Sequence, residues 1–431
     1  MQGTSDLSSY HPLVASRYLT KIGWITVLGW ICSTTSTTAL VANIVTGLAI
    51  FNYPAYVPQR WHFTLLMWAA TIVPFLINFW FQRVITALEA FGALCHVGVF
   101  SASIITLLLL AQRSTAEYVF QTLTNDISGW TNPAVAWGIG LLTVTYPLTG
   151  KFEPTGRTSY QQRSSIDATA GFDSVIHMSD EVKKARVQVP RSMINAVVLN
   201  AIMQFLYMMT VLFTIGDVDI VLADPLPILQ VYYQATGSRA ATNFFVSIIT
   251  VLAMIAFFNC FASTSRLVWA FSRDNGLPFS PTFAKVHPRF KLPINALILV
   301  AVCICLLSLL NIGSSTAFNA IISLVALALY ISYFFPILFL CWRRLSTSHP
   351  TPIPWGPFRL GWAGPVINVA ALCYIVFMLI WMPFPAFLPV DSMNMNYAGP
   401  ITGAVILCAI LDWCVSGRKR FQVPIARFGL D

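Results

Sequence analysis

Apolar runs of membrane-spanning length, separated by short polar segments, make up most of the chain. An α-helix needs about 20 apolar residues to cross the hydrocarbon core of a bilayer. The pattern therefore predicts an all-α, polytopic membrane protein with about ten transmembrane helices. We place them at residues 23 to 50, 62 to 80, 84 to 110, 132 to 150, 193 to 215, 241 to 271, 293 to 312, 316 to 342, 363 to 383 and 398 to 415.

The fourth apolar run differs from the others because helix breakers interrupt it. Gly138, Gly140, Pro147 and Gly150 fall within or at the end of this run. In lipid, unwound backbone persists only where it is buried in protein or lines a cavity, since every N–H and C=O group must be paired. We therefore expect a broken helix here, with backbone groups that bind a small solute.

Composition and charge support a membrane protein and define its orientation. Hydrophobic residues make up 57% of the chain and charged residues 10%, with a net charge of +9. Outside residues 151–171, basic side chains gather on one side of the predicted topology, and the opposite loops hold only Arg60, Arg113 and Arg239. By the positive-inside rule, both termini face the cytoplasm. The charge thus reports topology, and nucleic acid is not an expected partner.

This topology gives three regions. Residues 1–18 form a polar cytoplasmic N-terminus, residues 19–417 a transmembrane domain, and residues 418–431 a cytoplasmic tail. The basic residues 418–420 are interpreted as a stop-transfer flank, with a lipid-binding tail as the alternative.

The sequence carries no signature of an enzyme, a metal site or a cofactor site. Nine cysteines fall inside or at the ends of predicted spans, without a CxxC pair or a Cys/His cluster. They are expected to pack as small apolar residues rather than to form disulfides. Phosphate-binding glycine loops, nucleophile elbows and zinc-binding helices are also absent from the sequence.

Polar residues within the spans are the remaining candidates for function. Trp30 precedes a run of serine and threonine at 33–38, which could border a cavity or allow close helix packing. Glu89 and His96 lie two turns apart on one face of the third span, where they could relay a proton. The alternatives are a water-accessible Glu89 and a hydrogen-bonded interior His96. Asp412 is expected at the membrane interface.

Two sequence blocks and one shorter stretch resemble fungal amino acid and choline permeases of the amino acid-polyamine-organocation superfamily. Residues 172–192, FDSVIHMSDEVKKARVQVPRS followed by Met193, are similar to the cytoplasmic segment after the sixth helix of that family. Residues 262–278, ASTSRLVWAFSRDNGLP, resemble the end of its eighth helix, and residues 23–30 its third helix. The resemblance runs from about Tyr18 to the C-terminus, with one interruption.

The resemblance implies a twelve-helix secondary transporter built from an inverted repeat of five plus five helices. Matched in order, the predicted spans correspond to the third to twelfth helices of the family. The fold expected for this chain therefore lacks the first two helices, including the one that normally holds the substrate carboxylate. On this interpretation the chain is a truncated permease, and its gene model begins too late.

The interruption is a polar segment at residues 151–171, which separates two halves of the broken helix. In the family, the pair that matches Thr149 and Gly150 runs directly into the pair that matches Phe172 and Asp173. The ends of the segment can be encoded by codons that match consensus intron ends. We interpret it as a retained in-frame intron, with a real cytoplasmic insertion as the alternative, and expect it to be disordered.

By resemblance, the broken helix supplies one side of the substrate site through Tyr146, Thr149, Gly150, Phe172 and Asp173. The structural alternatives are lipid or helix packing for the aromatic residues and a helix C-cap for the threonine and glycine.

The sixth span supplies three further candidates. Asn259, Ser263 and Thr264 could bind a coupling ion or line the cavity, although such hydroxyls often bond backbone carbonyls instead.

The function implied is secondary active transport of amino acids or related amines, such as 4-aminobutyrate or choline, coupled to protons. The expected partners are this small solute, the proton and the lipid bilayer, with the plasma membrane favoured over the vacuole. The alternative is a non-transporting remnant or scaffold that lacks half of the site. A channel is disfavoured because no filter-like repeat occurs in the sequence.

Overall fold

The computed structural model describes residues 12–80, 82–121, 128–149, 185–290, 292–345, 356–385, 387–392 and 395–421. Every regular element within these ranges is a helix, in agreement with the all-α prediction. Among the described helices, nine are long and apolar enough to cross a membrane. The predicted insert at 151–171 lies outside the described residues.

The helices follow one another along the chain with short connections. The long ones are α2 (Pro12–Asn52), α3 (Arg60–Trp80), α4 (Gln82–Leu110), α6 (Pro133–Thr149), α8 (Ala185–Thr214), α11 (Arg239–Arg273), α13 (Ile294–Gly313), α14 (Ser315–Leu345), α15 (Ala363–Trp381) and α16 (Ala398–Asp412). The short ones are α5 (Ala116–Gln121), α9 (Val218–Ala223), α10 (Pro227–Thr236), α12 (Ser280–Phe283) and α17 (Arg418–Arg420), with a π-helical turn at Trp413–Gly417.

Most predicted spans match these helices at both ends within a few residues. The largest difference outside α2 is at α8, which begins at Ala185 rather than at residue 193. Arg186 and Arg191 are exposed in the additional turns, so the helix continues as a polar extension beyond its apolar run. Apolar length therefore predicts the segment within the membrane but not the full helix.

The prediction of a helix broken at Gly138 and Gly140 is wrong for these two glycines. Helix α6 is continuous from Pro133 to Thr149, where the described residues stop. Its 17 residues rise about 26 Å, which is shorter than the hydrocarbon core of about 30 Å. Gly138 instead permits close packing, because a Cβ atom there would clash with the ring of Trp381 on α15. Any interruption lies beyond Thr149, outside the described residues.

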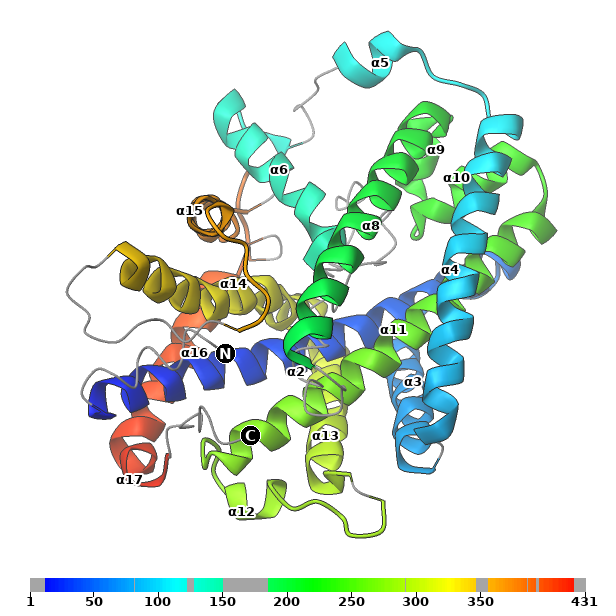
Figure 1. The fold of residues 1–431 in the computed structure, drawn as a ribbon. Coiled ribbons are helices and arrows are strands. Elements are labelled where there is room, and N and C mark those ends of the chain that lie inside the picture. The colour runs from blue at the N-terminus through cyan, green and yellow to red at the C-terminus, as the bar shows by residue number, and fades with distance from the viewer. Residues whose placement is uncertain are drawn as a thin grey trace.

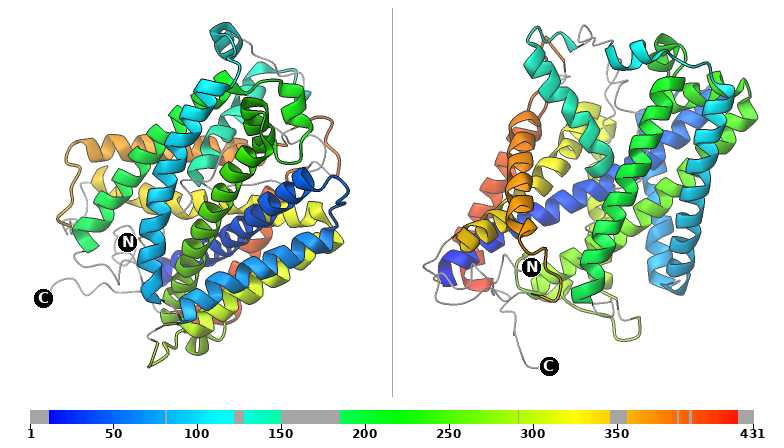
Figure 2. Two further views of the ribbon diagram at one scale, coloured as in Figure 1. Left: turned by 90° about the vertical axis from the view of Figure 1, so that its right-hand side faces the viewer. Right: turned by 45° about the horizontal axis from the view of Figure 1, so that its top comes forward.

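Helix α2 passes through the centre of the bundle and packs most extensively against α11 and α14 (Figures 1 and 2). Against α14 the approach is very close, because a Cβ atom on Gly29 would lie 2.9 Å from that of Ala328. Trp30, the next residue, is 2% exposed. Small residues thus bring the central helices together, as is typical of membrane interfaces.

Apolar side chains from α2 and α11 form the core of the bundle with neighbouring helices. One cluster joins them to α4 and α10 and includes Leu107 and Tyr232. A second cluster joins them to α13 and includes Phe261 and Ile304. The left view of Figure 2 shows α13 side by side with α3, and Trp68 of α3 donates to Ser308 Oγ of α13 across 2.8 Å.

Two polar contacts hold the end of the bundle where α2 ends and α11 begins. Asn52 and Asn243 exchange amide hydrogen bonds of 2.9 and 2.7 Å. Nearby, the hydroxyl of buried Tyr232 on α10 donates to Ser103 Oγ of α4 at 2.8 Å and lies 3.1 Å from the hydroxyl of Tyr207 on α8. Because burial disfavours the phenolate, the pKa of Tyr232 is raised and the hydroxyl remains a donor. The short helix α10 therefore connects α4 to α8.

We predict that Tyr232→Phe lowers the free energy of unfolding by about 1 to 3 kcal/mol, because it leaves buried hydroxyls on α4 and α8 with one partner fewer. The ring would still stack on Phe245, whose centroid lies 4.8 Å away. Thermal unfolding in detergent measures the effect. Tyr233→Phe is the matched control, since Tyr233 makes an aromatic contact with Phe51. Equal stability of the two variants would contradict the connecting role of the Tyr232 hydroxyl.

Candidate functional site

The serine and threonine run of α2 is buried at the centre of the bundle, and most of its hydroxyls bond their own helix. Thr35, Thr37 and Thr38 donate to the carbonyl groups of Ile31, Ser33 and Thr34, at 2.8 to 3.0 Å. These bonds satisfy the hydroxyl donors without a ligand. For these three threonines, the contacts favour the packing alternative.

Thr34 also connects α2 to α11. Its hydroxyl oxygen accepts from the hydroxyl of Thr264 at 2.6 Å, and the Thr264 oxygen also lies 3.4 Å from the Trp30 carbonyl oxygen. Thr34 donates to the same carbonyl at 2.8 Å, and both threonines are fully buried. The structure thus brings together two predicted site residues, Trp30 and Thr264, at the crossing of α2 and α11.

The neighbouring face of α11 carries the other two predicted residues of that span. Asn259 and Ser263 are four positions apart and therefore lie on one face, with Asn259 only partly buried. Ser263 is fully buried, yet its Oγ has no hydrogen-bond partner among the described residues. A buried hydroxyl without a partner carries a free-energy penalty of about 1 to 3 kcal/mol, which a ligand could remove. Ser263 is therefore the α11 hydroxyl best placed to bind a solute.

Helix α4 packs against α11 and carries the predicted proton relay. Gly92 of α4 faces Ile255 of α11, because a Cβ atom on Gly92 would lie 3.1 Å from the Ile255 side chain. Glu89 and His96 flank Gly92 at spacings of three and four residues, so they occupy the same α4 face. His96 is partly exposed, and the side chain of Glu89 lies outside the described part.

The residues expected from the broken helix fall wholly or partly outside the description. Tyr146 and Thr149 lie in α6, but the structure describes only their backbone. Gly150, Phe172 and Asp173 fall in residues 150–184, which the structure does not describe. The described neighbour of α6 is α15, so this half of the site remains a prediction.

Sequence analysis missed Arg266, which lies one turn beyond Thr264 and Ser263 on α11. Arg266 is 7% exposed, and its guanidinium group donates to the Ala262 carbonyl at 3.1 Å. A basic residue inside a span is rare and tends to be functional, and this signal was available from the sequence. In the sequence, Arg266 lies within residues 262–278, the block that resembles the end of the eighth helix of the family.

The side chains of the candidate site on α11 that precede Arg266 are neutral hydrogen-bonding groups, and Trp30 of α2 contacts them through its backbone carbonyl. Within the described residues, no three His, Cys, Asp or Glu side chains form a group that could hold a metal ion. The nine cysteines are all free thiols. Hydroxyls, an amide and a tryptophan suit recognition of a small polar or cationic solute.

We predict that Thr34→Val and Thr264→Val are energetically coupled. Each substitution keeps the β-branched shape but removes one hydroxyl of the 2.6 Å pair. The double variant should lose about 1 kcal/mol less stability than the sum of the single variants, because the second change no longer breaks an intact bond. Chemical or thermal unfolding in detergent gives the four values.

The control cycle pairs Thr34→Val with Thr250→Val, since Thr250 donates to the Val246 carbonyl of its own helix. The control changes should be additive. If the changes at Thr34 and Thr264 were additive as well, the bond between these two hydroxyls would contribute nothing to stability.

Comparison with known proteins identifies the family. The family model described as "Amino acid permease" matches residues 8–407. Relatives include the choline transporter of Saccharomyces cerevisiae, 28% identical over 400 residues that cover 91% of this chain and 66% of the relative. Amino-acid permease 2 of Neurospora crassa is 26% identical over 413 residues, which cover 94% of this chain and 70% of the relative.

A plant relative extends the comparison beyond fungi. The amino-acid permease BAT1 homolog of Oryza sativa is 27% identical over 427 residues, which cover 94% of this chain and 75% of the relative. The resemblance seen in the two sequence blocks is therefore confirmed, as is the prediction that the chain is not an enzyme. With a helical membrane fold and a family match over most of its length, the chain belongs to the amino acid permease family.

Proposed function

We propose that this chain carries amino acids or related amines, such as 4-aminobutyrate or choline, across the plasma membrane by proton-coupled alternating access. Family membership supports the class of activity, which is transmembrane transport of amino acids or amines. The choline transporter among the relatives motivates the inclusion of a quaternary amine. The observation that carries the location of the site is the buried Ser263 hydroxyl, which has no partner among the described residues.

In this proposal the solute binds where α11 faces α4, beside the crossing with α2. Ser263 and Asn259 bond its polar groups, and the ring of Trp30 attracts an ammonium group through the negative face of its π-system. Thr264 holds α2 and α11 in register through its bond to Thr34. The predicted residues of the broken helix, which include Tyr146 and Phe172, complete the opposite wall.

Proton coupling in this proposal uses the α4 face that carries Glu89 and His96. A proton that binds there changes the charge next to the α11 face, and so changes the affinity for a cationic or zwitterionic solute. The basic residues at the end of α11 and in α17 support a cytoplasmic position for both termini. On this orientation, α2 begins at the cytoplasmic side and α11 ends there.

We predict that Ser263→Ala reduces uptake about tenfold or more while it leaves thermal stability unchanged or slightly higher. The substitution removes a buried hydroxyl that makes no bond within the described protein, so the fold loses nothing. The test measures uptake of labelled 4-aminobutyrate, choline and neutral amino acids into proteoliposomes, with thermal unfolding in parallel.

Ser265→Ala is the matched control, because Ser265 is equally buried but donates to the Ala262 carbonyl at 2.7 Å. The control should keep its uptake and lose a little stability. If Ser263→Ala transports as well as the unmodified chain, the proposed location of the site is wrong. If the unmodified chain takes up none of these solutes, the proposed activity is wrong.

We predict that replacing Glu89 and His96 together by glutamine abolishes the dependence of uptake on pH. Neither glutamine can bind or release a proton near neutral pH, so the coupling step would be lost while the solute site remains. Initial uptake rates measured from pH 5 to 8 give the profile. His62→Gln, at the start of α3, serves as a control outside the site. An unchanged pH profile after the double replacement would exclude Glu89 and His96 as the coupling groups.

A further inference from the structure

The last helical segment of the structure contains a nearly buried ion pair that bonds the backbone of another helix. Arg420 Nη2 lies 3.0 Å from Asp412 Oδ2 and 3.2 Å from Asp412 Oδ1, and the two side chains are 22% and 14% exposed. Arg420 Nη1 donates to Ser416 Oγ at 3.1 Å. Arg418 and Lys419 of the same turn are exposed. Arg420 therefore differs from its basic neighbours, because it is partly buried and paired with a carboxylate.

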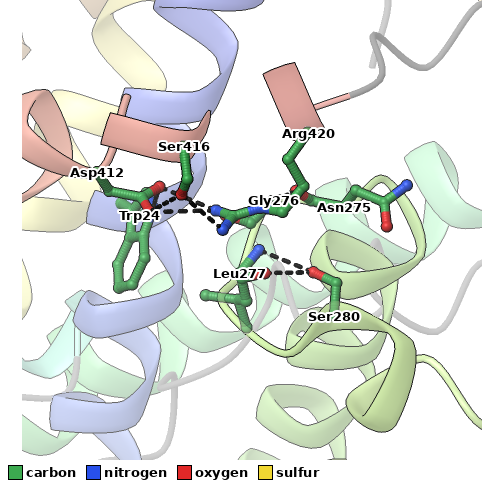
Figure 3. Close-up of polar contacts among 8 residues, drawn as sticks. All are labelled: Trp24, Asn275, Gly276, Leu277, Ser280, Asp412, Ser416 and Arg420. Atoms are coloured by element: carbon green, nitrogen blue, oxygen red, sulfur yellow. Dashed lines mark hydrogen bonds and ion pairs between the residues drawn. The ribbon is translucent and has the colours of Figure 1, made fainter. Parts of the chain in front are cut away.

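The same guanidinium binds the turn that ends α11. Its Nε donates to the Asn275 carbonyl at 2.8 Å, and Nη2 donates to the Gly276 carbonyl at 3.1 Å (Figure 3). These carbonyls are presented by a left-handed helix end, with φ of 58° at Asn275 and a bond from Gly276 N to Phe271 O of 2.9 Å. Arg420 thus caps α11 with two charge-assisted hydrogen bonds.

Asp412 connects this arrangement to α2. Trp24 donates from Nε1 to Asp412 Oδ2 at 3.2 Å (Figure 3). Gly23 and Gly276 both lie against the ring of Phe271, so a Cβ atom at either glycine would clash with that ring. Trp24 of α2, the end of α11 and the end of α16 therefore meet at one ion pair.

These contacts lie on the two helices whose crossing carries the candidate site, at Trp24 within α2 and at the end of α11. Trp24 precedes Thr34 by ten residues on α2, and Arg273 follows Thr264 by nine on α11. At 1.5 Å per residue, both separations are about 15 Å. Because an α-helix is stiff over this length, a shift at the ion pair would move Thr34 relative to Thr264.

We propose that Arg420 is a positioning residue, which sets the register of α2 against α11 through Asp412, Trp24 and the carbonyls of Asn275 and Gly276. The effect on transport rests on the function proposed above, whereas the effect on register does not. The basic tail is then a structural connector in addition to a topology signal.

Arginine is required at this position by geometry as well as by charge. Its planar fork reaches a carboxylate, a hydroxyl and two carbonyls at once, whereas lysine has a single ammonium group. The nearby carboxylate of Asp274 is already paired with Arg273, whose Nε lies 3.9 Å from Asp274 Oδ1, so it does not account for the place of Arg420. Burial raises the pKa of Asp274, and Arg273 opposes that rise. Arg420→Lys therefore keeps the charge but should lose most of the bonds.

A disulfide between substituted cysteines can report the register directly. Thr34 and Thr264 have hydroxyl oxygens 2.6 Å apart, so Thr34→Cys with Thr264→Cys should crosslink rapidly under a membrane-permeant oxidant. We expect Arg420→Lys to slow this crosslink roughly tenfold, since displacements of about an ångström are known to have effects of that size or larger. Arg418→Lys, an exposed neighbour with the same change, should crosslink at the original rate. Peptide mass spectrometry distinguishes this disulfide from links to native Cys32 and Cys260.

Two further variants test the path through Asp412. Trp24→Phe removes the indole N–H donor and part of the ring but leaves the bonds of Arg420 intact, so it should slow the crosslink less than Arg420→Lys does. Asp412→Asn should slow it to a similar extent as Arg420→Lys, because the amide lacks the charge that holds the guanidinium. Thermal unfolding identifies any variant that is globally destabilised.

Uptake assays on chains that keep both threonines then separate the two proposals. We expect Arg420→Lys to raise the KM for the transported solute with less effect on the maximal rate, while Arg418→Lys changes neither. A crosslink slowed in Arg420→Lys, in a chain that transports no solute, would support the positioning role and reject the proposed function. An unchanged crosslinking rate in Arg420→Lys would overturn the positioning role whatever the uptake result.

Discussion

The structure depends on the requirement that polar groups in a bilayer find their partners within the protein. The helices satisfy the backbone, and the threonines of α2 satisfy their hydroxyls on carbonyls of the preceding turn. Helix α2 can therefore carry six consecutive buried hydroxyl residues at the centre of the bundle, from Ser33 to Thr38. Two buried hydroxyls, Ser36 Oγ on α2 and Ser263 Oγ on α11, have no partner among the described residues, and Thr34 contacts Thr264 on the neighbouring helix.

The sequence predicted the apolar part of most helices well, because apolar length sets that part, although α2 and α8 extend beyond it. Helix α13, at Ile294–Gly313, was expected at 293 to 312. Glycine was a poorer guide, because a glycine such as Gly138 can either break a helix or allow a neighbouring ring to pack against it. The sequence is the same in both cases. The clash that a Cβ atom would make with Trp381 depends on α15, which is distant in sequence. Tertiary contacts decide between these two roles, and a linear pattern does not contain them.

The candidate site was predictable in part, for the same reason. Polar residues within an apolar run predicted Ser263 and Thr264 on α11, and the serine and threonine run of α2 directed attention to Trp30. Which hydroxyl bonds its own helix and which faces another helix depends on rotation about the helix axis and on the partner. The role of Arg420 was not predictable, because it bonds backbone carbonyls that are distant in the sequence and presented by the left-handed turn at Asn275. A basic residue after the last span has the same sequence signal whether it caps a helix or flanks the membrane.

The central claim is that the α11 face at Ser263 lines a solute path in a permease. Modification of Ser263→Cys by a charged, water-soluble thiol reagent, with and without each labelled solute, tests it most directly. The account predicts that the introduced thiol reacts, and that one of the amines or amino acids slows the reaction in proportion to its occupancy. A thiol that stays unmodified under conditions that modify an exposed reference cysteine, or that reacts at a rate unaffected by every solute, would contradict the account.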